Sequence, residues 1–519
     1  MAALWLLSVL LPGTTRAQAP PSSPSLPPGP VTLEQVLAIA ESRSEAVSMA
    51  RQGMRRAEGD QVRARSGLLP QLSASAGYDR ALASEFEGVF EDGFFGSDDV
   101  ETDTSFEDLP FGRENTWRAS LSLSQNLYSG GRLGAQAQVA AAGRDSAELG
   151  LTTARAQALL DVTEAYYDAV LSERLAAIAE ATFEQAGATL RQVEAGFGAG
   201  AQPEFEVLRA GVTRDSQRAV VIRQRASRDI AMLRLKQLLD LPASYDLRLA
   251  DALGDEALPP SPAFVERVGP VERALRADGA VAASLQLDVE LPARTAVAEA
   301  DVTVRLAEAS LRLARAQRMP SASLTSSYTR VGYPSGALPT FDRTNWSIGA
   351  TLSLPILTGG RQRGDEMVAR ADLEQSRLQR QQVEELAGLE TRAAWAELRA
   401  AHAAWEATQG TVEQADRAYQ IAEVRYGAGV STQLELTDAR LLRQQAEVNR
   451  AQAARDLQVA RARVALLPDL PLGAVGAGPA SVAPAQQAPA PAPSPQAPPL
   501  PRAPQAAGQF TTASAQVPQ

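Results

Sequence analysis

Residues 425–432 of the chain read Arg-Tyr-Gly-Ala-Gly-Val-Ser-Thr, and residues 197–200 read Phe-Gly-Ala-Gly. The two Gly-Ala-Gly stretches lie 229 positions apart, and at this offset the two halves of the chain align without a gap over a long range. The other matches are Trp117 on Trp346, Gly130-Gly131-Arg132 on Gly359-Gly360-Arg361, Tyr166 on Trp395, Glu206 on Glu435, and Leu241-Pro242 on Leu470-Pro471. Self-similarity over such a length is typical of a repeated structural unit. We therefore expect an internal duplication in which both halves fold alike.

The offset becomes 250 before the tryptophans, where Leu69-Pro70 aligns with Met319-Pro320 and Tyr78 with Tyr328. The difference is an insertion in the first half at about 82–115, which is rich in Asp and Glu. A calcium site is conceivable there, but the spacing lacks the glycine and the distal glutamate of an EF-hand loop. We expect a solvated acidic loop.

Two segments in each half alternate between apolar and small polar residues with a period of two. They are 71–80 and 116–127 in the first half, and 322–329 and 346–354 in the second. This period, with segments of about ten residues and aromatic residues near their ends, is typical of transmembrane β-strands. An amphipathic sheet packed on a soluble core is the alternative. The Ser- and Thr-rich polar faces favour the membrane, since no apolar partner element is available.

Strand number then limits the architecture. An open sheet edge does not occur in lipid, and single-chain barrels need at least about eight strands. Four strands per chain therefore predict a barrel shared between two, three or four copies, and the residues alone do not choose among them.

A Gly-Gly-Arg sequence follows each strand pair and precedes a long helix-forming stretch. Residues 130–195 and 359–424 would each span roughly 100 Å as a helix. Gly198 and Gly200 follow the first stretch, and Gly427 and Gly429 follow the second. Glycine favours the positive φ that ends many helices, so we expect a turn there and a second helix that returns to about 240 or 465. Shorter helices are expected over 33–66 and 292–318.

The chain ends have a different composition. Residues 1–19 contain a short apolar run and an Ala-Gln-Ala stretch, which resemble a signal peptide with its cleavage site, although no Lys or Arg precedes Arg16. Residues 20–30 read as a Pro/Ser-rich linker. Residues 471–519 are rich in Ala, Pro and Gln, and we expect this tail to be disordered because it cannot bury a core.

Composition argues against several function classes. The 519 residues include one histidine and no cysteine, which lowers the expectation of a metal site, a cofactor or an enzyme. No P-loop and no G-x-S-x-G motif occurs, so we predict no catalytic residue. The net charge of −11 argues against a nucleic-acid partner. Tyr166, Trp395 and Trp405 lie in helix-forming stretches, and we expect them to pack between helices.

The sequence resembles the TolC family of outer-membrane efflux ducts over about residues 31–470. The resemblance is carried by Leu69-Pro70 and Met319-Pro320, by both Gly-Gly-Arg junctions, and by residues 425–432 with Glu435 and Ala439 after them. It implies a homotrimer with a 12-stranded β-barrel in the outer membrane and a helical barrel in the periplasm of a Gram-negative bacterium. It also implies a periplasmic adaptor and an inner-membrane pump as partners, and an extracellular position for the acidic loop.

The resemblance also implies roles for residues at the helical turns. Gly198, Gly200, Gly427 and Gly429 would form the periplasmic tip, where the channel closes and the adaptor docks. Glu435 and Asp438 would line the closed pore as two acidic rings, although solvated surface acids are the alternative. Tyr426 would hydrogen-bond across to Glu206. Ser431 occupies the position that can carry a basic residue, so we expect a weaker latch.

These expectations divide the chain into a signal peptide, a linker, a first repeat, an equatorial segment, a second repeat and a tail. The bounds are 1–19, 20–30, 31–242 (β-hairpin 70–128, helical hairpin 130–240), 243–291, 292–470 (β-hairpin 320–355, helical hairpin 359–466) and 471–519. The predicted function is an exit duct of a tripartite efflux pump or a type I secretion system. The alternative is a periplasmic coiled-coil structural or adaptor protein outside the membrane.

Overall fold

The computed structural model describes residues 29–82, 115–251, 253, 259–277, 293–333, 341 and 343–473. The predicted signal peptide, nearly all of the linker, the acidic loop and the tail from residue 474 lie outside these residues. All described residues belong to one compact unit.

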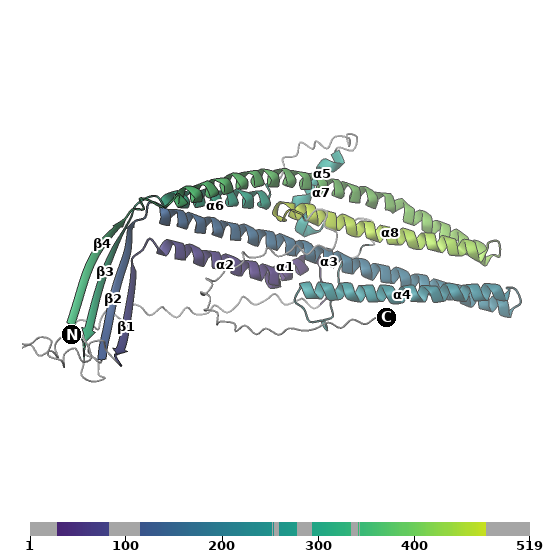
Figure 1. The fold of residues 1–519 in the computed structure, drawn as a ribbon. Coiled ribbons are helices and arrows are strands. Elements are labelled where there is room, and N and C mark those ends of the chain that lie inside the picture. The colour runs from purple at the N-terminus through teal and green to yellow at the C-terminus, as the bar shows by residue number, and fades with distance from the viewer. Residues whose placement is uncertain are drawn as a thin grey trace, which may run out of the picture. The chain divides into compact units, whose positions relative to one another are not determined.

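Helices account for most of the described chain (Figure 1). In the first half they are α1 (Leu33–Arg43), α2 (Glu45–Ser66), α3 (Arg132–Gly198) and α4 (Glu204–Leu238), and in the second α5 (Pro262–Ala277), α6 (Thr295–Ala316), α7 (Arg361–Gly427) and α8 (Gln433–Leu466). The single helix expected over 33–66 is wrong. Ser44 interrupts it, because its side chain accepts a hydrogen bond from the Val47 amide at 3.4 Å and so begins a new helix.

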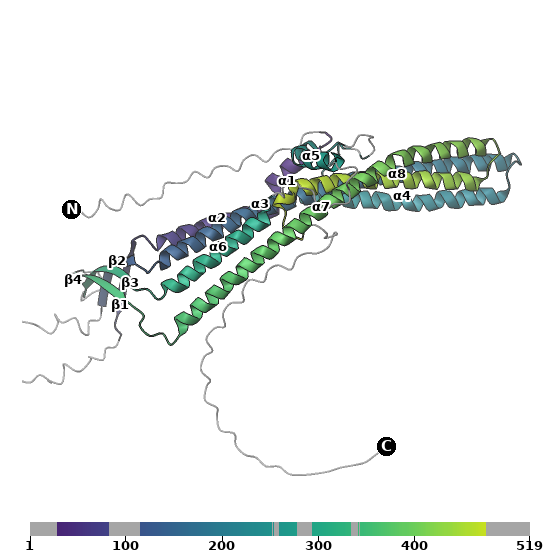
Figure 2. The ribbon, with the colours of Figure 1, turned by 90° about the horizontal axis from the view of Figure 1, so that it is seen from above.

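The two long helices, α3 and α7, each contain 67 residues. Both begin two residues later than expected and continue three residues further, through Gly198 and Gly427. α4 packs along the second half of α3, and α8 packs along the second half of α7 (Figures 1 and 2). Contacts between α3 and α8 join the two helical hairpins.

The four expected strands are confirmed as one antiparallel sheet in the order β1-β2-β3-β4. They are β1 (Gln71–Arg80), β2 (Asn115–Tyr128), β3 (Ser321–Gly332) and β4 (Arg343–Ser353). The register joins the polar sides of the strands into one surface, which we call the hydroxyl face. One of its rows is Ser73, Ser122, Ser327 and Ser347. The opposite, apolar face includes the row Ala74, Leu121, Tyr328 and Trp346.

The Gly-Gly-Arg junctions require their glycines. Gly130 and Gly359 have φ of 60° and 58°, and Gly131 and Gly360 have φ of 87°. L-residues with a side chain rarely adopt these angles. Arg132 and Arg361 are the first residues of α3 and α7, so the two glycines before each arginine lie outside the helix. Two consecutive left-handed residues thus turn each strand directly into its long helix.

The main core lies where α1, α3, α4, α5, α7 and α8 meet. Tyr166 is fully buried there and donates a hydrogen bond to the Val31 carbonyl at 3.2 Å. Trp395 and Trp405 are also buried in this cluster, so the expected packing role of all three aromatic residues is confirmed. This core holds the middle of both long helices in place. One end of each helix adjoins the sheet, and the other end adjoins a helical turn.

Two buried ion pairs border this core. Arg294 and Glu390 approach to 3.4 Å with side chains that are 3% and 8% exposed. The Arg294 guanidinium also donates to the Leu470 carbonyl at 3.2 Å. Burial lowers the pKa of Arg294, and the charge of Glu390 offsets part of this effect. In the second pair, Arg461 donates to Glu272 at 2.6 Å. These pairs connect α8 and the residues after it to α5, α6 and α7.

Candidate gate at the helical turns

The turns that end α3 and α7 have the same hydrogen-bond pattern. The amide of Gly200 donates to the Phe197 carbonyl, and that of Ala201 donates to the Gly196 carbonyl. Gly429 and Val430 repeat this pattern in the second turn. Both are Schellman motifs, in which the residue after the C-cap is left-handed. Gly200 and Gly429 have φ of 74° and 72°, so only the second glycine of each predicted pair serves the turn in this way.

Tyr426, in the last turn of α7, contacts two separate apolar clusters. One is Tyr419, Ala422 and Leu436 in its own hairpin, and the other is Leu190, Val193 and Ala210 of the α3–α4 hairpin. Its ring therefore joins the two hairpins near their ends. Tyr426, which the sequence predicts to be a gate residue, does lie at this junction, and the contacts that join the two hairpins here are apolar.

The predicted hydrogen bond between Tyr426 and Glu206 is not formed within the single chain. Glu206 lies near enough that its charge, after burial, raises the pKa of Tyr426. Its Oε2 atom is buried and has no hydrogen-bond partner. A buried carboxylate oxygen without a donor is unfavourable, so a small movement that brings the tyrosine hydroxyl to it would be stabilising. The predicted gate bond stays a prediction.

Glu435 and Asp438 both lie exposed in the first turns of α8. Ser431 donates a hydrogen bond to Glu435 at 2.5 Å, so this serine contacts its own hairpin rather than α3 or α4. Arg425 lies 3.8 Å from the same carboxylate. The Glu435 charge is therefore partly compensated by a neighbour that the sequence analysis did not consider, whereas Asp438 has no ion pair with the described residues.

Arg440 provides a direct polar link between the hairpins that the sequence analysis missed. It lies on α8, is 5% exposed, and donates from Nη2 to Thr189 Oγ1 on α3 at 2.9 Å. The two residues are 251 positions apart, and nothing in the sequence pairs them. Together with the apolar contacts of Tyr426, this bond holds the α7–α8 hairpin against α3–α4 near the turns.

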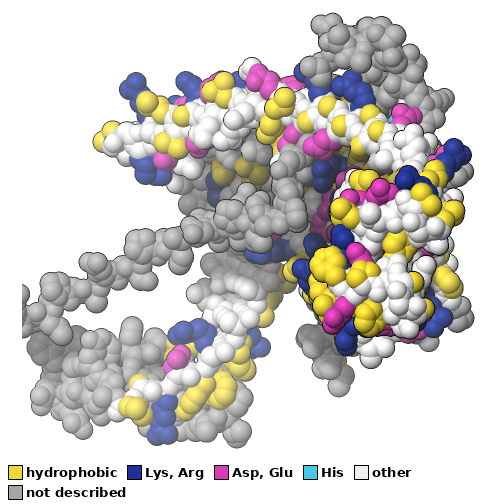
Figure 3. Space-filling view, turned by 90° about the vertical axis from the view of Figure 1, so that its right-hand side faces the viewer, with side chains coloured by type: hydrophobic (Ala, Val, Ile, Leu, Met, Phe, Trp, Pro, Cys, Tyr) yellow, Lys and Arg dark blue, Asp and Glu magenta, His cyan; other side chains and the backbone are white. Residues whose placement is uncertain are grey.

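The surface at this end carries no large patch of one charge. Basic, acidic and hydrophobic side chains are interleaved on the face that Figure 3 presents. Within the described residues, no group of His, Cys, Asp or Glu is arranged to hold a metal ion. No described helix combines the length and the apolar character needed to cross a bilayer.

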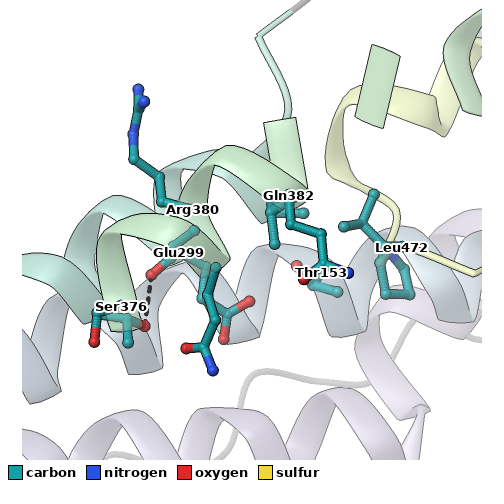
Figure 4. A pocket seen from close by; sticks show the side chains of 12 residues that line it. Thr153, Glu299, Ser376, Arg380, Gln382 and Leu472 are labelled. Atoms are coloured by element: carbon teal, nitrogen blue, oxygen red, sulfur yellow. Dashed lines mark hydrogen bonds between the residues drawn. The ribbon is translucent and has the colours of Figure 1, made fainter. Parts of the chain in front are cut away.

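A groove of about 420 Å³ lies further along the helices, among α3, α6, α7 and Leu472 (Figure 4). Glu299 and Arg380 are the charged residues that line it. Arg380 extends away from the groove in Figure 4 and is paired with Asp301 and Glu384. Its other polar lining residues are Thr153, Thr303, Ser376, Gln379 and Gln382.

Comparison with known proteins decides the family. The family model described as "Outer membrane efflux protein" matches residues 36–240 and 287–468. The chain belongs to the outer membrane efflux protein family. The resemblance to TolC-like ducts is thereby confirmed, and membership places this outer membrane efflux protein in the outer membrane of a Gram-negative bacterium, with its helices in the periplasm.

Individual relatives agree with this assignment. The pyoverdine export outer membrane protein OpmQ of Pseudomonas putida is 26% identical over 434 residues, which cover 81% of this chain and 82% of the relative. The crystal structure of the Campylobacter jejuni CmeC channel gives a TM-score of 0.65 at 17% identity, covering 85% of this chain and 86% of that one. VceC of Vibrio cholerae gives 0.63 at 18% identity, covering 84% and 96%. These structures show the fold of an outer membrane efflux protein.

Proposed function

We propose that three copies of this chain close a 12-stranded barrel and form the exit duct of a tripartite efflux pump or a type I secretion system. A periplasmic adaptor docks at the turns of the helical hairpins and an inner-membrane pump supplies the energy. The duct itself conducts substrate passively once its periplasmic end opens.

The sheet carries this proposal. It presents one apolar face and one hydroxyl face, and β1 and β4 are its edge strands. Unpaired strand edges cost several kcal/mol per exposed polar group in lipid, so a sheet that belongs to an outer-membrane protein needs further strands to close it. Pairing β4 of one chain with β1 of the next supplies them without another type of subunit.

The names of two relatives favour an export role. The Pseudomonas putida relative is named for the export of pyoverdine. The alternative of a periplasmic protein outside the membrane is disfavoured, since the chain belongs to an outer membrane family.

Two measurements test the proposed assembly. Light scattering of the detergent-extracted protein, corrected for bound detergent, should give three times the mass of the mature chain. Because the sequence has no cysteine, single cysteines placed in β1 and β4 should form disulfides between chains, whereas a matched pair in β1 and β2 should form them within one chain. A monomer that stays in solution without detergent would contradict the proposal.

A further inference from the structure

The groove of about 420 Å³ beside Leu472 is formed by four segments of one chain. Thr153 comes from α3, Glu299 from α6 and Gln382 from α7, and Pro471 and Leu472 follow α8 (Figure 4). A cavity of this volume is in the range that holds a small organic ligand. Because all of these walls belong to the same chain, the groove does not require contacts between copies.

Two hydrogen bonds hold the end wall of the groove, residues 471–472, in place. The carbonyl of Leu470, directly before this wall, accepts a hydrogen bond from Arg294 at 3.2 Å. The amide of Gly473, directly after it, donates to Glu390. Arg294 and Glu390 are themselves the buried ion pair described above. The wall is therefore fixed at both ends, and ligand sites are usually pre-formed in this way.

The lining combines an apolar surface with polar groups that can still accept hydrogen bonds. Its apolar residues are Ala296, Ala300, Val383, Pro471 and Leu472. The side chains of Gln379 and Gln382 make no hydrogen bond with the described residues. The hydroxyls of Thr303 and Ser376 donate to carbonyls one turn earlier in their own helices, so toward a ligand they can act only as acceptors. A bound molecule would thus meet mainly acceptor groups.

The charge of the lining is also suited to a cation. Arg380 is the only basic residue among the described residues that line the groove, and it is held in ion pairs by acids on α6 and α7. Arg305, further along α6, is paired with Asp145 of α3 at 3.1 Å. Glu299, by contrast, makes no ion pair with any described residue. The groove therefore presents a carboxylate whose charge is not compensated.

We infer that this groove binds an organic cation in which an ammonium group is attached to an apolar body. The Glu299 carboxylate accepts a hydrogen bond from the ammonium group, and the amide and hydroxyl oxygens of the lining accept from its other N–H groups. The apolar body lies against Ala300, Val383 and Leu472. Hydrogen bonds between two charged groups are stronger than neutral ones, and burial of the apolar body adds to them. The inference goes beyond the proposed function, because the site needs neither a trimer nor conduction.

The probe is naphthylmethylamine, which carries an ammonium group on an aromatic body, and naphthylmethanol is its neutral partner. Each compound is dialysed to equilibrium against the full-length protein in a nonionic detergent, and detergent alone corrects for uptake by micelles. The amine should bind saturably, and the alcohol should bind roughly tenfold more weakly because it lacks the charge. The affinity for the amine should fall as the ionic strength rises.

Three single variants locate the binding. Glu299→Gln keeps the size of the side chain and removes its charge, so the dissociation constant of the amine should rise roughly tenfold. Thermal stability should not change, since no ion pair with the described residues is lost. Ala300→Leu adds volume to the lining and should abolish binding of the amine. Glu413→Gln is the matched control, because Glu413 is an exposed acid on α7 that does not line the groove.

The results separate the site from the duct. Saturable binding that is weakened by Glu299→Gln, abolished by Ala300→Leu and unchanged by Glu413→Gln supports the inference. Equal weakening by Glu299→Gln and Glu413→Gln would overturn it, because the amine would then respond only to overall charge. A wild-type trimer that takes up no more amine than the detergent blank would also overturn it while leaving the proposed duct in place. Saturable binding with the same variant pattern in a protein that never forms trimers would support the site and contradict the duct.

Discussion

Arg440 on α8 donates a hydrogen bond to Thr189 on α3 across 2.9 Å, and the arginine is 5% exposed. The bond lies between the two helical hairpins, near the apolar junction made by Tyr426. Hydrogen bonds from a charged donor in a buried site are among the stronger ones. Separation of the hairpins at the turns would therefore have to break it.

Arg440→Ala should favour the open state of the duct. Loss of one charged hydrogen bond of about 1.5 kcal/mol corresponds to a roughly tenfold larger open population. Thr189→Val removes the acceptor while keeping the side-chain volume, and it should act in the same direction. Single-channel recording of open probability and mean conductance measures both variants.

Arg443→Ala is the control for this prediction. Arg443 lies one turn further along α8 but pairs with Asp416 and Glu447, both within the α7–α8 hairpin. Its loss should weaken that hairpin without releasing it from α3. Equal opening by Arg443→Ala and Arg440→Ala would show that hairpin stability, and not the bond to Thr189, controls the gate.

The acids of α8 should contribute unequally to ion selectivity. Arg425 and Ser431 partly compensate Glu435, whereas Asp438 has no ion pair with the described residues. Glu435→Ala with Asp438→Ala should raise conductance and lower the K⁺ to Cl⁻ permeability ratio by at least about twofold. Asp438→Ala alone should give most of that change. Reversal potentials in a salt gradient measure it, and an unchanged ratio would exclude the acidic rings.

Much of the fold follows from the sequence because two local signals are strong. The period-two alternation placed β1 without error and β2 within a residue, and the doubled Gly-Gly-Arg located both strand-to-helix junctions. The break at Ser44 and the last residues of α3 and α7 are harder to predict from the sequence. A serine cap favours the start of a new helix over continuation of the first one by only a small free energy. A glycine in the last helical turn also cannot be told from the sequence apart from the glycine that follows the helix.

The candidate site was predictable only where a turn marks it. The glycines locate the two helix ends, but the contacts between hairpins depend on which faces of α3 and α8 meet. Arginine is frequent in these helices, and no local pattern distinguishes Arg440 from Arg443.

The two Gly-Gly-Arg junctions offer a matched test of how a strand passes into its long helix. Gly130 and Gly359 have nearly the same φ, so alanine costs a similar backbone strain at both positions. A Cβ at Gly130 would lie 2.2 Å from Cβ of Met319, whereas at Gly359 it would meet no atom within 4 Å. Gly130→Ala should therefore be more destabilising than Gly359→Ala by about 1–3 kcal/mol. Thermal denaturation of the detergent-extracted assembly, followed by circular dichroism, compares them.

Gly130→Ala with Met319→Ala is the check on this explanation. Cβ of Met319 is itself the nearest atom, so alanine there removes the rest of the side chain but leaves that contact. The double variant should therefore recover little stability. Full recovery would mean that the outer methionine atoms, and not the close approach of the two backbones, cause the loss.

Removing one member of the buried pair of Arg294 and Glu390 should strongly lower thermal stability, whereas replacing both with apolar residues should change it little. Glu390→Ala leaves a nearly inaccessible guanidinium without its counter-charge, and such losses cost about 3–5 kcal/mol. Two nitrogens of Arg294, Nε and Nη1, already have no hydrogen-bond partner. Arg294→Met with Glu390→Leu removes both charges together and should be close to wild type in thermal stability. Arg294 also donates to the Leu470 carbonyl, and Glu390 accepts from the Gly473 amide. A double variant as unstable as Glu390→Ala would show that these two hydrogen bonds contribute more to stability than the paired charges.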